Sequence, residues 1–452
     1  MSRIAVIGAG WAGAACAWQL SQQGHEVTVF ESSPTLGGRA RRVQATWGTI
    51  DNGQHLLIGA YTQTLELMTA LGLAPEQRFH RQELRFQSLD QTFSFGYWPL
   101  PAPWHQLGAI WGSRGLGWKD KLALLKLMSH LKKQRWQPPV GQTVAQLLTQ
   151  CGQSPLLIER LWQPLCIAAL NTPINEACAQ IFAAVLRDSL GSGRHSTQLL
   201  IPLKDMTQLW VQQALQDIPY HTGTPIQKLQ YDAQQRLLLF SQKPHHALAQ
   251  PFDCCVIATQ VPPAVRLLQS LETSTHAQQE VLSTLKEIRF NPIATLYLQP
   301  EFAWTLPTPM SMLYEDHARR HYGQWVFNHA ALPTSFAQNT ISIVISDAAA
   351  LKAQDKATVT AALIEQLQSQ LPRGQHPLPP IVDSMLITEQ RATFWASPQL
   401  KRPKANSPWP GIYFAADWVD SDYPAVLEGA VRSGLSTAKL IHTALSDAPS
   451  RG

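Results

Sequence analysis

Residues 50–61, which read IDNGQHLLIGAY, place several side chains that could transfer protons within one short stretch. The polar side chains are those of Asp51, Asn52, Gln54, His55 and Tyr61. An unperturbed histidine titrates near neutral pH, so this stretch could supply a general acid or base. By itself it fits two interpretations: a surface loop between core segments, or a polar strip beside a reacting group. The elements around it must decide between them.

A strand, a glycine-rich turn and a helix open the chain. Residues 3–7 form a short β-branched run, residues 8–13 read GAGWAG, and an apolar helical segment follows. In a GxGxxG turn of this kind, Gly8 allows the tight turn and Gly10 lets the backbone approach a pyrophosphate. Gly13 lets the helix and the strand pack closely. The spacing therefore predicts a dinucleotide-binding turn.

The helix after this turn and the next strand complete the unit. Free N–H groups at the helix start attract phosphates, which would bring Trp11 and Ala12 beside the cofactor. The second strand, residues 26–30, ends in Glu31, 18 residues after Gly13. A carboxylate at that position can accept hydrogen bonds from ribose hydroxyls. Together these features predict a Rossmann-like βαβ unit.

A second glycine motif, Gly37-Gly38-Arg39, follows the acid directly. It resembles the second dinucleotide signature of the flavin-dependent amine oxidase and carotenoid desaturase superfamily. The resemblance implies FAD as cofactor, with the two glycines against the pyrophosphate and Arg39 neutralising phosphate charge. It also implies that residues 50–61 lie along the isoalloxazine ring. The cofactor contacts expected there are Asn52, Gly53, Gln54 and His55.

Two further elements of the superfamily come later in the chain. Residues 411–441 read as a strand, an acid and a helix. The resemblance implies that Asp417 holds a ribityl hydroxyl and that the helix starting near Leu427 faces the pyrimidine end of the ring, where its dipole stabilises the reduced flavin. Ala416 stands where the superfamily usually has glycine, and it fits if the backbone there is not left-handed. The backbone near Ile226 is expected to meet the adenine.

Long intervals separate these elements, so the expected FAD domain is discontinuous. The predicted fold class is α/β and amine oxidase-like, with two domains. Residues 1–80, 195–270 and 400–446 form the Rossmann-like FAD-binding domain, and residues 81–194 and 271–399 form a mixed-sheet and helical substrate domain. No second GxGxxG follows a later strand. We therefore expect no nicotinamide domain and an electron donor that the sequence does not identify.

Composition narrows the classes of partner. Only 15% of the 452 residues are charged, against about a quarter in an average globular protein, and the net charge is +5. The chain lacks the Lys/Arg clusters with stacking aromatics that a nucleic-acid groove needs, so no nucleic acid is expected. The six cysteines show no metal spacing, so we predict no metal site and a reducing cytoplasm. Without a signal peptide or an apolar run of about 18 residues, we expect a soluble or peripheral protein.

A basic helix rich in tryptophan is expected at residues 114–136. The nearby tryptophans are Trp98, Trp104, Trp111, Trp118 and Trp136. Residues 114–135 carry the cations Arg114, Lys119, Lys121, Lys126, Lys132, Lys133 and Arg135 against the single acid Asp120. This combination is typical of a helix that lies in a membrane interface, here the inner face of the cytoplasmic membrane. An ordinary surface helix packed on the substrate domain explains it equally well.

Over its whole length the chain is similar to the hydroxysqualene dehydroxylases, squalene-associated flavoproteins of bacterial hopanoid pathways. The most distinctive stretches are GTIDNGQHLLIGAYTQTLELMTALGL and LWQPLCIAALNTPINEACAQIF, and AVIGAGWAGAACAWQL and DWVDSDYPAVLEGAVRSG support them. The resemblance implies reductive removal of the allylic hydroxyl of hydroxysqualene, a C30 isoprenoid lipid, to give squalene. It also makes the prenyl-synthase-like enzymes upstream of this step candidate partners.

Such a reaction needs a proton donor, because hydroxide leaves poorly. We expect His55 to be this acid, since its unperturbed pKa lies near neutrality. Tyr61 and the group Asp420, Asp422 and Tyr423 are the alternatives. An imidazole that only orients the flavin is the competing interpretation of His55. For Asp51, also a catalytic candidate, the competing interpretation is a structural role in the turn.

Other functions use the same elements. A carotenoid-type desaturase would remove hydride from an equally apolar substrate and would need an electron acceptor. An amine oxidase would need an aromatic cage, for which Trp418 and Tyr423 are candidates, and would make peroxide in air. A flavin-bound scaffold for prenyl-lipid enzymes would use the basic helix alone, and neither substrate nor reductant would alter its flavin.

Overall fold

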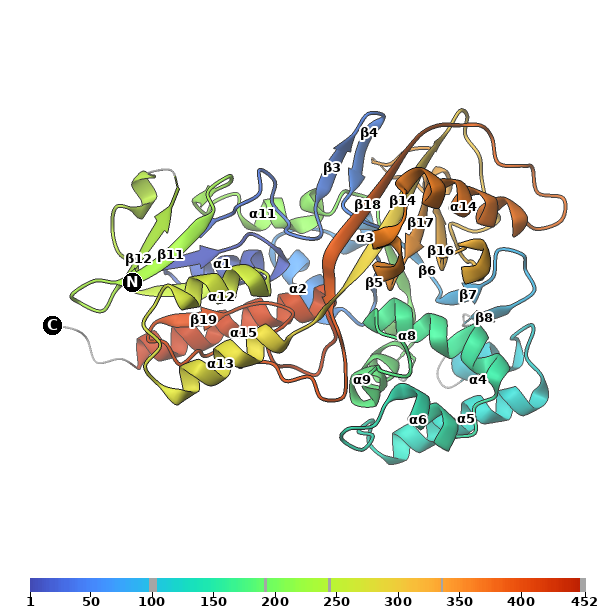
Figure 1. Cartoon of the computed structure of the whole chain (residues 1–452), viewed down its shortest axis with the longest axis horizontal. Coiled ribbons are helices and arrows are strands. Elements are labelled where there is room, and N and C mark those ends of the chain that lie inside the picture. The colour runs from blue at the N-terminus through green and yellow to red at the C-terminus, as the bar shows by residue number, and fades with distance from the viewer. Residues whose placement is uncertain (97–103, 191–192, 243–244, 335, 448–452) are drawn as a thin grey trace.

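The computed structural model describes residues 1–96, 104–190, 193–242, 245–334 and 336–447. The first of its two main sheets is parallel and has the strand order β10–β2–β1–β13–β19 (Figure 1). The strands are β1 (Arg3–Ile7), β2 (Glu26–Phe30), β10 (Tyr220–His221), β13 (Cys254–Ile257) and β19 (Ile412–Phe414). All five come from the three segments predicted for the FAD domain. The Rossmann-like α/β fold class is thus confirmed, and the exact domain boundaries stay a prediction.

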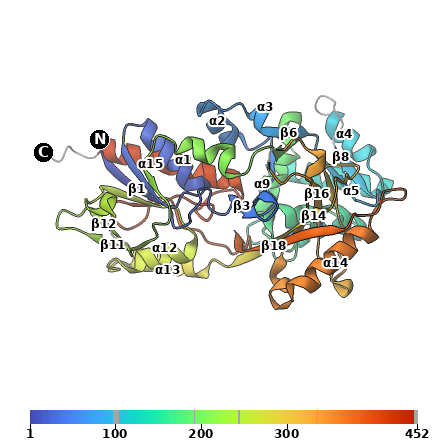
Figure 2. The same cartoon turned by 90° about the horizontal axis from the view of Figure 1, so that it is seen from above.

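Helices cover both faces of this parallel sheet (Figure 2). Ile4 and Val6 pack with α1 (Trp11–Gln22) and α15 (Leu427–Ser446), and the alternate residues Ala5 and Ile7 belong to the cluster that includes α12 (Val261–Gln269) and α13 (His276–Glu287). A strand buried on both faces is a continuous apolar run, as Ile4–Ile7 of β1 are. Helices α1 and α15 approach closely because α15 presents a glycine, Gly434, to the backbone of Ala12.

The second sheet is antiparallel and has the order β15–β16–β17–β14–β18. Its strands are β14 (Phe290–Pro300), β15 (Met310–Met312), β16 (Trp325–Asn328), β17 (Ile341–Ile345) and β18 (Ile381–Phe394). Alternation along the strands gives the sheet two apolar faces. Val326 and Ile343 pack with α14 (Lys356–Ser369), and Trp325 and Val344 point to the opposite face. The strand pair β14–β18 extends from this sheet toward the parallel sheet (Figure 1).

Residues 104–190 form a helical layer. It contains α4 (Trp104–Trp111), α5 (Trp118–Lys133), α6 (Val144–Gln150), α7 (Pro155–Leu157), a π-helical turn (Ile158–Trp162), α8 (Gln163–Leu170) and α9 (Ala179–Ser189). Asn171 separates α8 from α9. That residue is left-handed, with φ of 48°, and caps the end of α8. Of the tryptophans noted around the basic helix, Trp98 lies outside the described residues.

Short elements connect these layers. They are β3 (Arg42–Ala45), β4 (Gly48–Asp51), β5 (Leu57–Ile58), α2 (Thr62–Ala70), α3 (Pro75–Arg78), β6 (Phe79–Gln82), β7 (Arg85–Gln87), β8 (Ser94–Gly96), α10 (Arg194–Thr197), β9 (Leu199–Pro202), a π-helical turn (Thr207–Val211), α11 (Gln212–Ala214), β11 (Ile226–Tyr231) and β12 (Leu237–Ser241). Short 3-10 helices occupy His246–Leu248, His317–Arg319, His329–Ala331 and Ala348–Ala353. Within the described ranges, every helix is too short or too polar to cross a lipid bilayer.

Candidate active site

A cavity of about 800 Å³ lies where the two sheets and the helical layer meet. Sixteen of the residues expected from the sequence to bind the cofactor or act in catalysis line it. These are Gly8, Gly10, Trp11, Ala12, Glu31, Gly37, Gly38, Arg39, Asn52, Gly53, Gln54, His55, Tyr61, Ile226, Asp417 and Leu427. They come from six separated stretches of chain, so folding assembles them into one site. Gly13 and Asp51 stand outside this lining. Of the alternative acids, Asp422 and Tyr423 line the cavity and Asp420 does not.

Gly13 supports the turn from behind. A Cβ atom at this position would lie 1.9 Å from Gly8 O, so only glycine lets α1 approach β1 this closely. The second glycine motif packs on the first, because Gly37 N donates to Ala9 O at 2.9 Å. Gly38 has φ of 64°, which a side chain would strain. The two motifs therefore form a backbone surface that no side chain interrupts.

Two helices start at the cavity without a side-chain cap. Gly10 precedes α1 and Val426 precedes α15, and neither helix start receives a hydrogen bond from a capping side chain. The first-turn N–H groups of both helices are therefore open to an acceptor in the cavity. Uncapped helix starts attract anions and partial negative charge. This arrangement fits a group that carries phosphates at one end and a reducible ring at the other.

Glu31 closes the first turn at the end of β2. Its carboxylate accepts hydrogen bonds from Ala9 N at 2.7 Å and from Ser33 N at 2.8 Å, and the side chain is buried. Oε1 also accepts from Ser32 Oγ at 3.2 Å, and Oε2, which accepts from Ala9 N, can accept a second hydrogen bond. Glu31 can therefore hold the loop in place and still accept hydrogen bonds from the hydroxyls of a ligand in the cavity.

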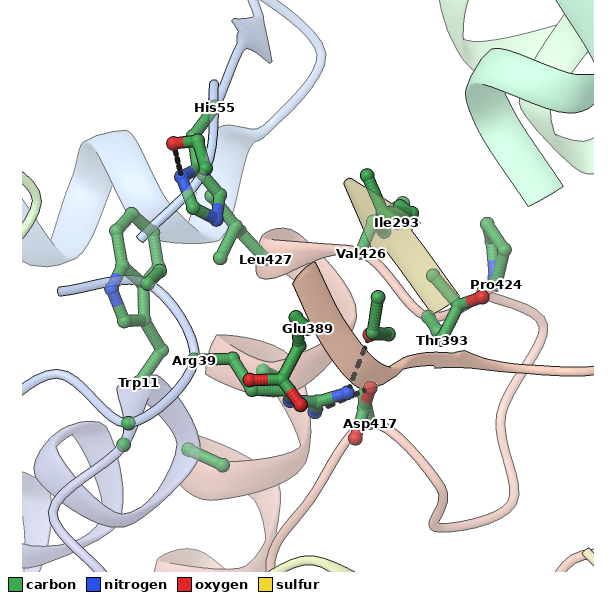
Figure 3. A pocket seen from close by; sticks show the side chains of 18 of the residues that line it. Trp11, Arg39, His55, Ile293, Glu389, Thr393, Asp417, Pro424, Val426 and Leu427 are labelled. Carbon is green, nitrogen blue, oxygen red and sulfur yellow. Dashed lines mark hydrogen bonds and ion pairs between the residues drawn. The ribbon is translucent and has the colours of Figure 1, made fainter. Parts of the chain in front are cut away.

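Arg39 and Asp417 form an ion pair at the cavity wall. Arg39 Nη2 lies 2.7 Å from Asp417 Oδ2, and Arg39 Nη1 donates to Ala392 O of β18 at 2.7 Å. Figure 3 shows the two side chains pointing toward each other, with Glu389 beside the guanidinium. The family resemblance implies separate roles for them, with Arg39 at the phosphates and Asp417 at a ribityl hydroxyl. The structure shows that each also fixes the other, which joins the second glycine motif to the C-terminal motif.

His55 lies on the same side of the pocket as Trp11 (Figure 3). Its Nδ1 is 2.8 Å from Gly53 O, so the neutral ring donates its proton there and leaves Nε2 as an acceptor. Burial, and then the nearby charge of Arg39, lower the pKa of His55 to about 4. The prediction that His55 is the acid depends on a pKa near neutrality. The structure removes that premise, because a neutral imidazole bound in this way has no free proton to donate.

Two tyrosines line the cavity near each other. Burial raises the pKa of Tyr61, with Glu428 and Tyr423 adding to the shift, so its phenol stays protonated over the physiological range. In the part of the chain that the structure describes, the Tyr61 hydroxyl has no hydrogen-bond partner. The Tyr423 hydroxyl donates to Asp188 Oδ2 at 3.1 Å. Burial, followed by the charge of Asp188, raises the pKa of Tyr423 to about 12. Tyr61 is thus the free phenol of the pair.

Asp51 lies behind the cavity wall. It is buried at the end of β4, and its Oδ1 accepts a hydrogen bond from Met206 N at 2.9 Å. Burial raises the pKa of Asp51 well above its usual value, and the neighbouring Asp205 adds to the shift. These contacts anchor the hairpin β3–β4 to residues 205–207. The geometry therefore favours the structural interpretation of Asp51 over the catalytic one.

Apolar side chains line the other end of the cavity. They come from β7, α8, α9 and the inner face of the antiparallel sheet, and include Leu84, Phe86, Leu165, Ala168, Ala169, Ala184, Val185, Met310, Trp325, Phe327 and Val344. Trp418, considered for an aromatic cage with Tyr423, lies elsewhere. It is buried against Phe414, and its Nε1 donates to Thr259 O at 2.9 Å.

Several cavity residues carry no sequence motif. Glu389 comes from β18, a strand that the sequence analysis did not predict, and Asp188 comes from the end of α9. His329 lies behind the wall, and its Nε2 is 2.9 Å from Gln54 Oε1. Ser342 Oγ donates to the same oxygen at 3.1 Å. These residues meet the first motifs only through tertiary packing, so no local pattern in the sequence marks them.

Comparison with known proteins agrees with this geometry. The sequence matches the flavin containing amine oxidoreductase family over residues 11–442. The chain belongs to this family. As a family member it is a flavin-dependent oxidoreductase, and the uncapped helix starts and glycine turns are the residues available to hold the flavin.

The similar proteins of known function differ in how much of this chain they match. The hydroxysqualene dehydroxylase of Zymomonas mobilis is 26% identical over 97% of this chain and 99% of its own length. The enzyme of the same name from Rhodopseudomonas palustris is 27% identical over 97% and 98%. The zeta-carotene desaturase of a Synechocystis species is 33% identical, but over only 27% of this chain and 25% of its own.

A solved structure confirms the fold. Cyclohexylamine oxidase from Brevibacterium oxydans superposes with a TM-score of 0.69, covering 98% of this chain and 99% of that one, at 17% sequence identity. The amine oxidase-like architecture expected from the sequence is thus confirmed across both sheets. At this identity the likeness concerns the fold and carries no substrate.

Proposed function

We propose that this family member binds FAD and reductively removes the allylic hydroxyl of hydroxysqualene to give squalene. One observation carries the proposal. A single cavity joins the dinucleotide motifs to a long apolar end, in a chain that resembles hydroxysqualene dehydroxylases over nearly its full length. A C30 hydrocarbon chain suits such a lining, because few polar groups there would be left without a partner.

FAD, as a dinucleotide, fits the elements at the polar end. Its pyrophosphate would lie at the start of α1 against Gly10 and Gly38, and its ribose hydroxyls near Glu31. Arg39 supplies positive charge beside these groups. The start of α15 would face the ring, where its dipole favours the reduced state. When bound and reduced, the flavin supplies the hydride for carbon.

The protein side of the reaction is a proton transfer to the leaving hydroxyl. The C–O bond breaks with both electrons on oxygen, a proton from the protein converts that oxygen to water, and the carbon gains hydride. We assign the proton to Tyr61, whose hydroxyl is protonated, lines the cavity and has no other partner among the described residues. His55 then acts as an acceptor that orients the neighbouring polar groups.

The alternatives fit the site less well. A carotenoid desaturase would use the same apolar cavity, but the desaturase relative matches only about a quarter of the chain. For an amine oxidase, the proposed cage fails because Trp418 lies outside the cavity lining. A flavin-bound scaffold without chemistry would use the helix starts to hold the flavin, but it leaves the protonated Tyr61 without a use.

An anaerobic assay tests the proposal. The purified protein is loaded with FAD, reduced chemically and mixed with hydroxysqualene, and the extracted lipids are identified by mass spectrometry. We expect squalene, one oxygen poorer than the substrate, and no product when the reductant is omitted. Turnover that instead requires an electron acceptor and lowers the hydrogen count of the lipid would establish a desaturase and refute the proposal.

A further inference from the structure

The loop between α4 and α5 brings exposed tryptophans together at one corner of the molecule, far from the chain termini (Figure 1). Trp111 ends α4 and is 56% exposed, and Trp118 begins α5 and is 65% exposed. Lys121 Nζ donates to Trp111 O at 2.8 Å, so the two helix ends are tied together. Leu122, one turn after Trp118, is 47% exposed. We call Trp111, Trp118 and Leu122 the aromatic corner.

Cations lie beside the aromatic corner and farther along α5. They are Arg114, Lys119, Lys121, Lys126, Lys132, Lys133 and Arg135. The single acid of this segment, Asp120, is already engaged, since it accepts hydrogen bonds from Gly117 N at 2.9 Å and Ser154 Oγ at 2.6 Å. Among the residues that the structure describes, none of the seven cations forms an ion pair. Against the single carboxylate of Asp120, the seven cations leave residues 114–135 with a net charge of +6.

The opposite side of α5 is ordinary protein core. Leu124, Leu127 and Leu131 are buried in the large apolar cluster. These leucines anchor α5 to the protein, so the exposed tryptophans are not needed for its packing. Exposed tryptophans grouped with lysines are uncommon on a soluble surface and typical of the lipid headgroup region.

We propose that the aromatic corner docks on an anionic lipid bilayer. Charge complementarity selects this occupant, because the tryptophan rings suit the interface between headgroups and acyl chains while the cations contact lipid phosphates. An acidic protein partner would meet the same charges and could also cover the indoles, so failure to bind anionic vesicles would favour such a partner.

The corner is joined to the apolar end of the cavity by direct contacts. Gln153 Nε2 donates to Ala123 O of α5 at 2.7 Å, and its Oε1 accepts from Trp162 Nε1 at 2.8 Å, just before α8. On the other side, Arg114 pairs with Ser94 of β8, and β8 pairs with β7. Both α8 and β7 line the cavity. Docking would therefore hold the apolar end near the bilayer, where, if the proposed function holds, a C30 lipid is dissolved.

Vesicle co-sedimentation of the flavin-loaded, full-length protein tests the docking. Vesicles of phosphatidylcholine alone are compared with vesicles that contain phosphatidylglycerol as the anionic lipid. We expect clear preference for the anionic vesicles. The double variant Trp111→Gln/Trp118→Gln and the double variant Lys119→Glu/Lys126→Glu should each lower partitioning at least about tenfold, since each cation near the surface contributes about fivefold.

Matched controls come from other surfaces of the chain. Phe302 is 59% exposed but follows the acid Glu301, and Lys352 and Lys356 are exposed around the start of α14. Phe302→Ser and Lys352→Glu/Lys356→Glu should change vesicle binding less than twofold. Equal binding of the wild type to neutral and anionic vesicles, or unchanged binding of both corner variants, overturns the proposal.

Turnover of detergent-dispersed hydroxysqualene, measured on the same samples, separates this proposal from the proposed function. The corner variants should keep wild-type turnover in detergent and lose it with substrate embedded in anionic vesicles. Vesicle binding without any turnover would leave the docking surface standing and refute the substrate assignment. Turnover without vesicle binding would support the substrate assignment and refute the docking surface.

Discussion

At one end of the cavity the wall is mainly backbone, whereas at the other end it is mainly side chains. The glycine turns around Gly10 and Gly38 and the uncapped starts of α1 and α15 present N–H groups. The apolar end is instead lined by side chains such as Phe86 of β7, Leu165 of α8 and Trp325 of the antiparallel sheet. Backbone recognition through glycines tolerates few substitutions, whereas the side chains of a lining can be exchanged to suit another substrate without altering the fold.

The largest effect is expected at the backbone end. A Cβ at Gly10 would meet no protein atom closer than Gly38 Cα at 3.8 Å, so Gly10→Val should fold. The new side chain occupies the space through which the backbone would contact the pyrophosphate. We expect flavin affinity to fall at least about 100-fold, or about 3 kcal/mol, as measured by the visible absorbance of bound flavin.

A matched control is Gly193→Val, because a Cβ there meets nothing within 4 Å. It should retain full flavin content and an unchanged circular dichroism spectrum. A yellow Gly10→Val protein with wild-type affinity would show that the backbone surface does not hold the cofactor.

The next effect concerns the boundary between the two ends, where the proton is supplied. Tyr61→Phe removes only the hydroxyl, and a positioned proton donor contributes about 10²-fold or more. We therefore expect single-turnover reduction of substrate to slow at least about 100-fold with flavin binding unchanged. His55→Gln should slow it less than about tenfold, because the wild-type imidazole is already neutral.

The pH profile distinguishes the same two side chains. A tyrosine whose pKa is raised stays protonated across neutral pH, so turnover should show no break between pH 6 and about 7.5. A rate that falls through a pKa near 6.5 in the wild type, and loses that break in His55→Gln, would return the acid role to His55.

A third effect tests how the two ends are joined. His329, on the sheet that walls the apolar end, meets Gln54 of the polar end, and burial lowers its pKa to about 4 from a usual value of 6.5. Because the unfolded chain binds this proton more readily, the His329 contribution is fully present above pH 6.5 and is lost as the pH falls toward 4. Between pH 7 and 5 we expect a loss of about 1–2 kcal/mol.

Urea unfolding of His329→Gln at both pH values checks this contribution. Glutamine can still hydrogen-bond to Gln54 but does not titrate, so its stability should vary less between pH 7 and 5 than that of the wild type. An identical pH dependence in both proteins would mean that His329 titrates freely and does not link the two ends in the way described.

The smallest effect is expected at the side-chain end. Ala169 of α8 lines the cavity and is partly buried, so Ala169→Phe adds a ring to the apolar lining. We expect KM for hydroxysqualene to rise about tenfold, with flavin binding unchanged, because volume is lost for the long chain alone. A shorter allylic prenyl alcohol should be affected less than the C30 substrate. Equal effects on both alcohols would place Ala169 outside the substrate path.

The sequence alone predicted the local elements of the polar end. The first strand, the turn, the helix and Glu31 follow from short apolar runs and glycine conformation within about thirty residues, and β1, α1 and β2 occur where they were expected. Ala416 also behaves as expected, since it is not among the described residues with positive φ. Such features depend on neighbours along the chain, so no knowledge of packing is needed to find them.

Only the tertiary structure decided what the candidate side chains can do. His55 loses its expected pKa through burial and through Arg39, Asp51 is turned toward Met206, and Glu389 reaches the cavity on an unpredicted strand. Each of these outcomes depends on which distant segments pack around the group. Burial and neighbouring charges set its proton affinity, and the packed neighbours set the direction of its side chain. The sequence thus determined the local elements of the polar end and which of its side chains could do chemistry. The packing between segments determined which of those side chains face the cavity with a proton to give.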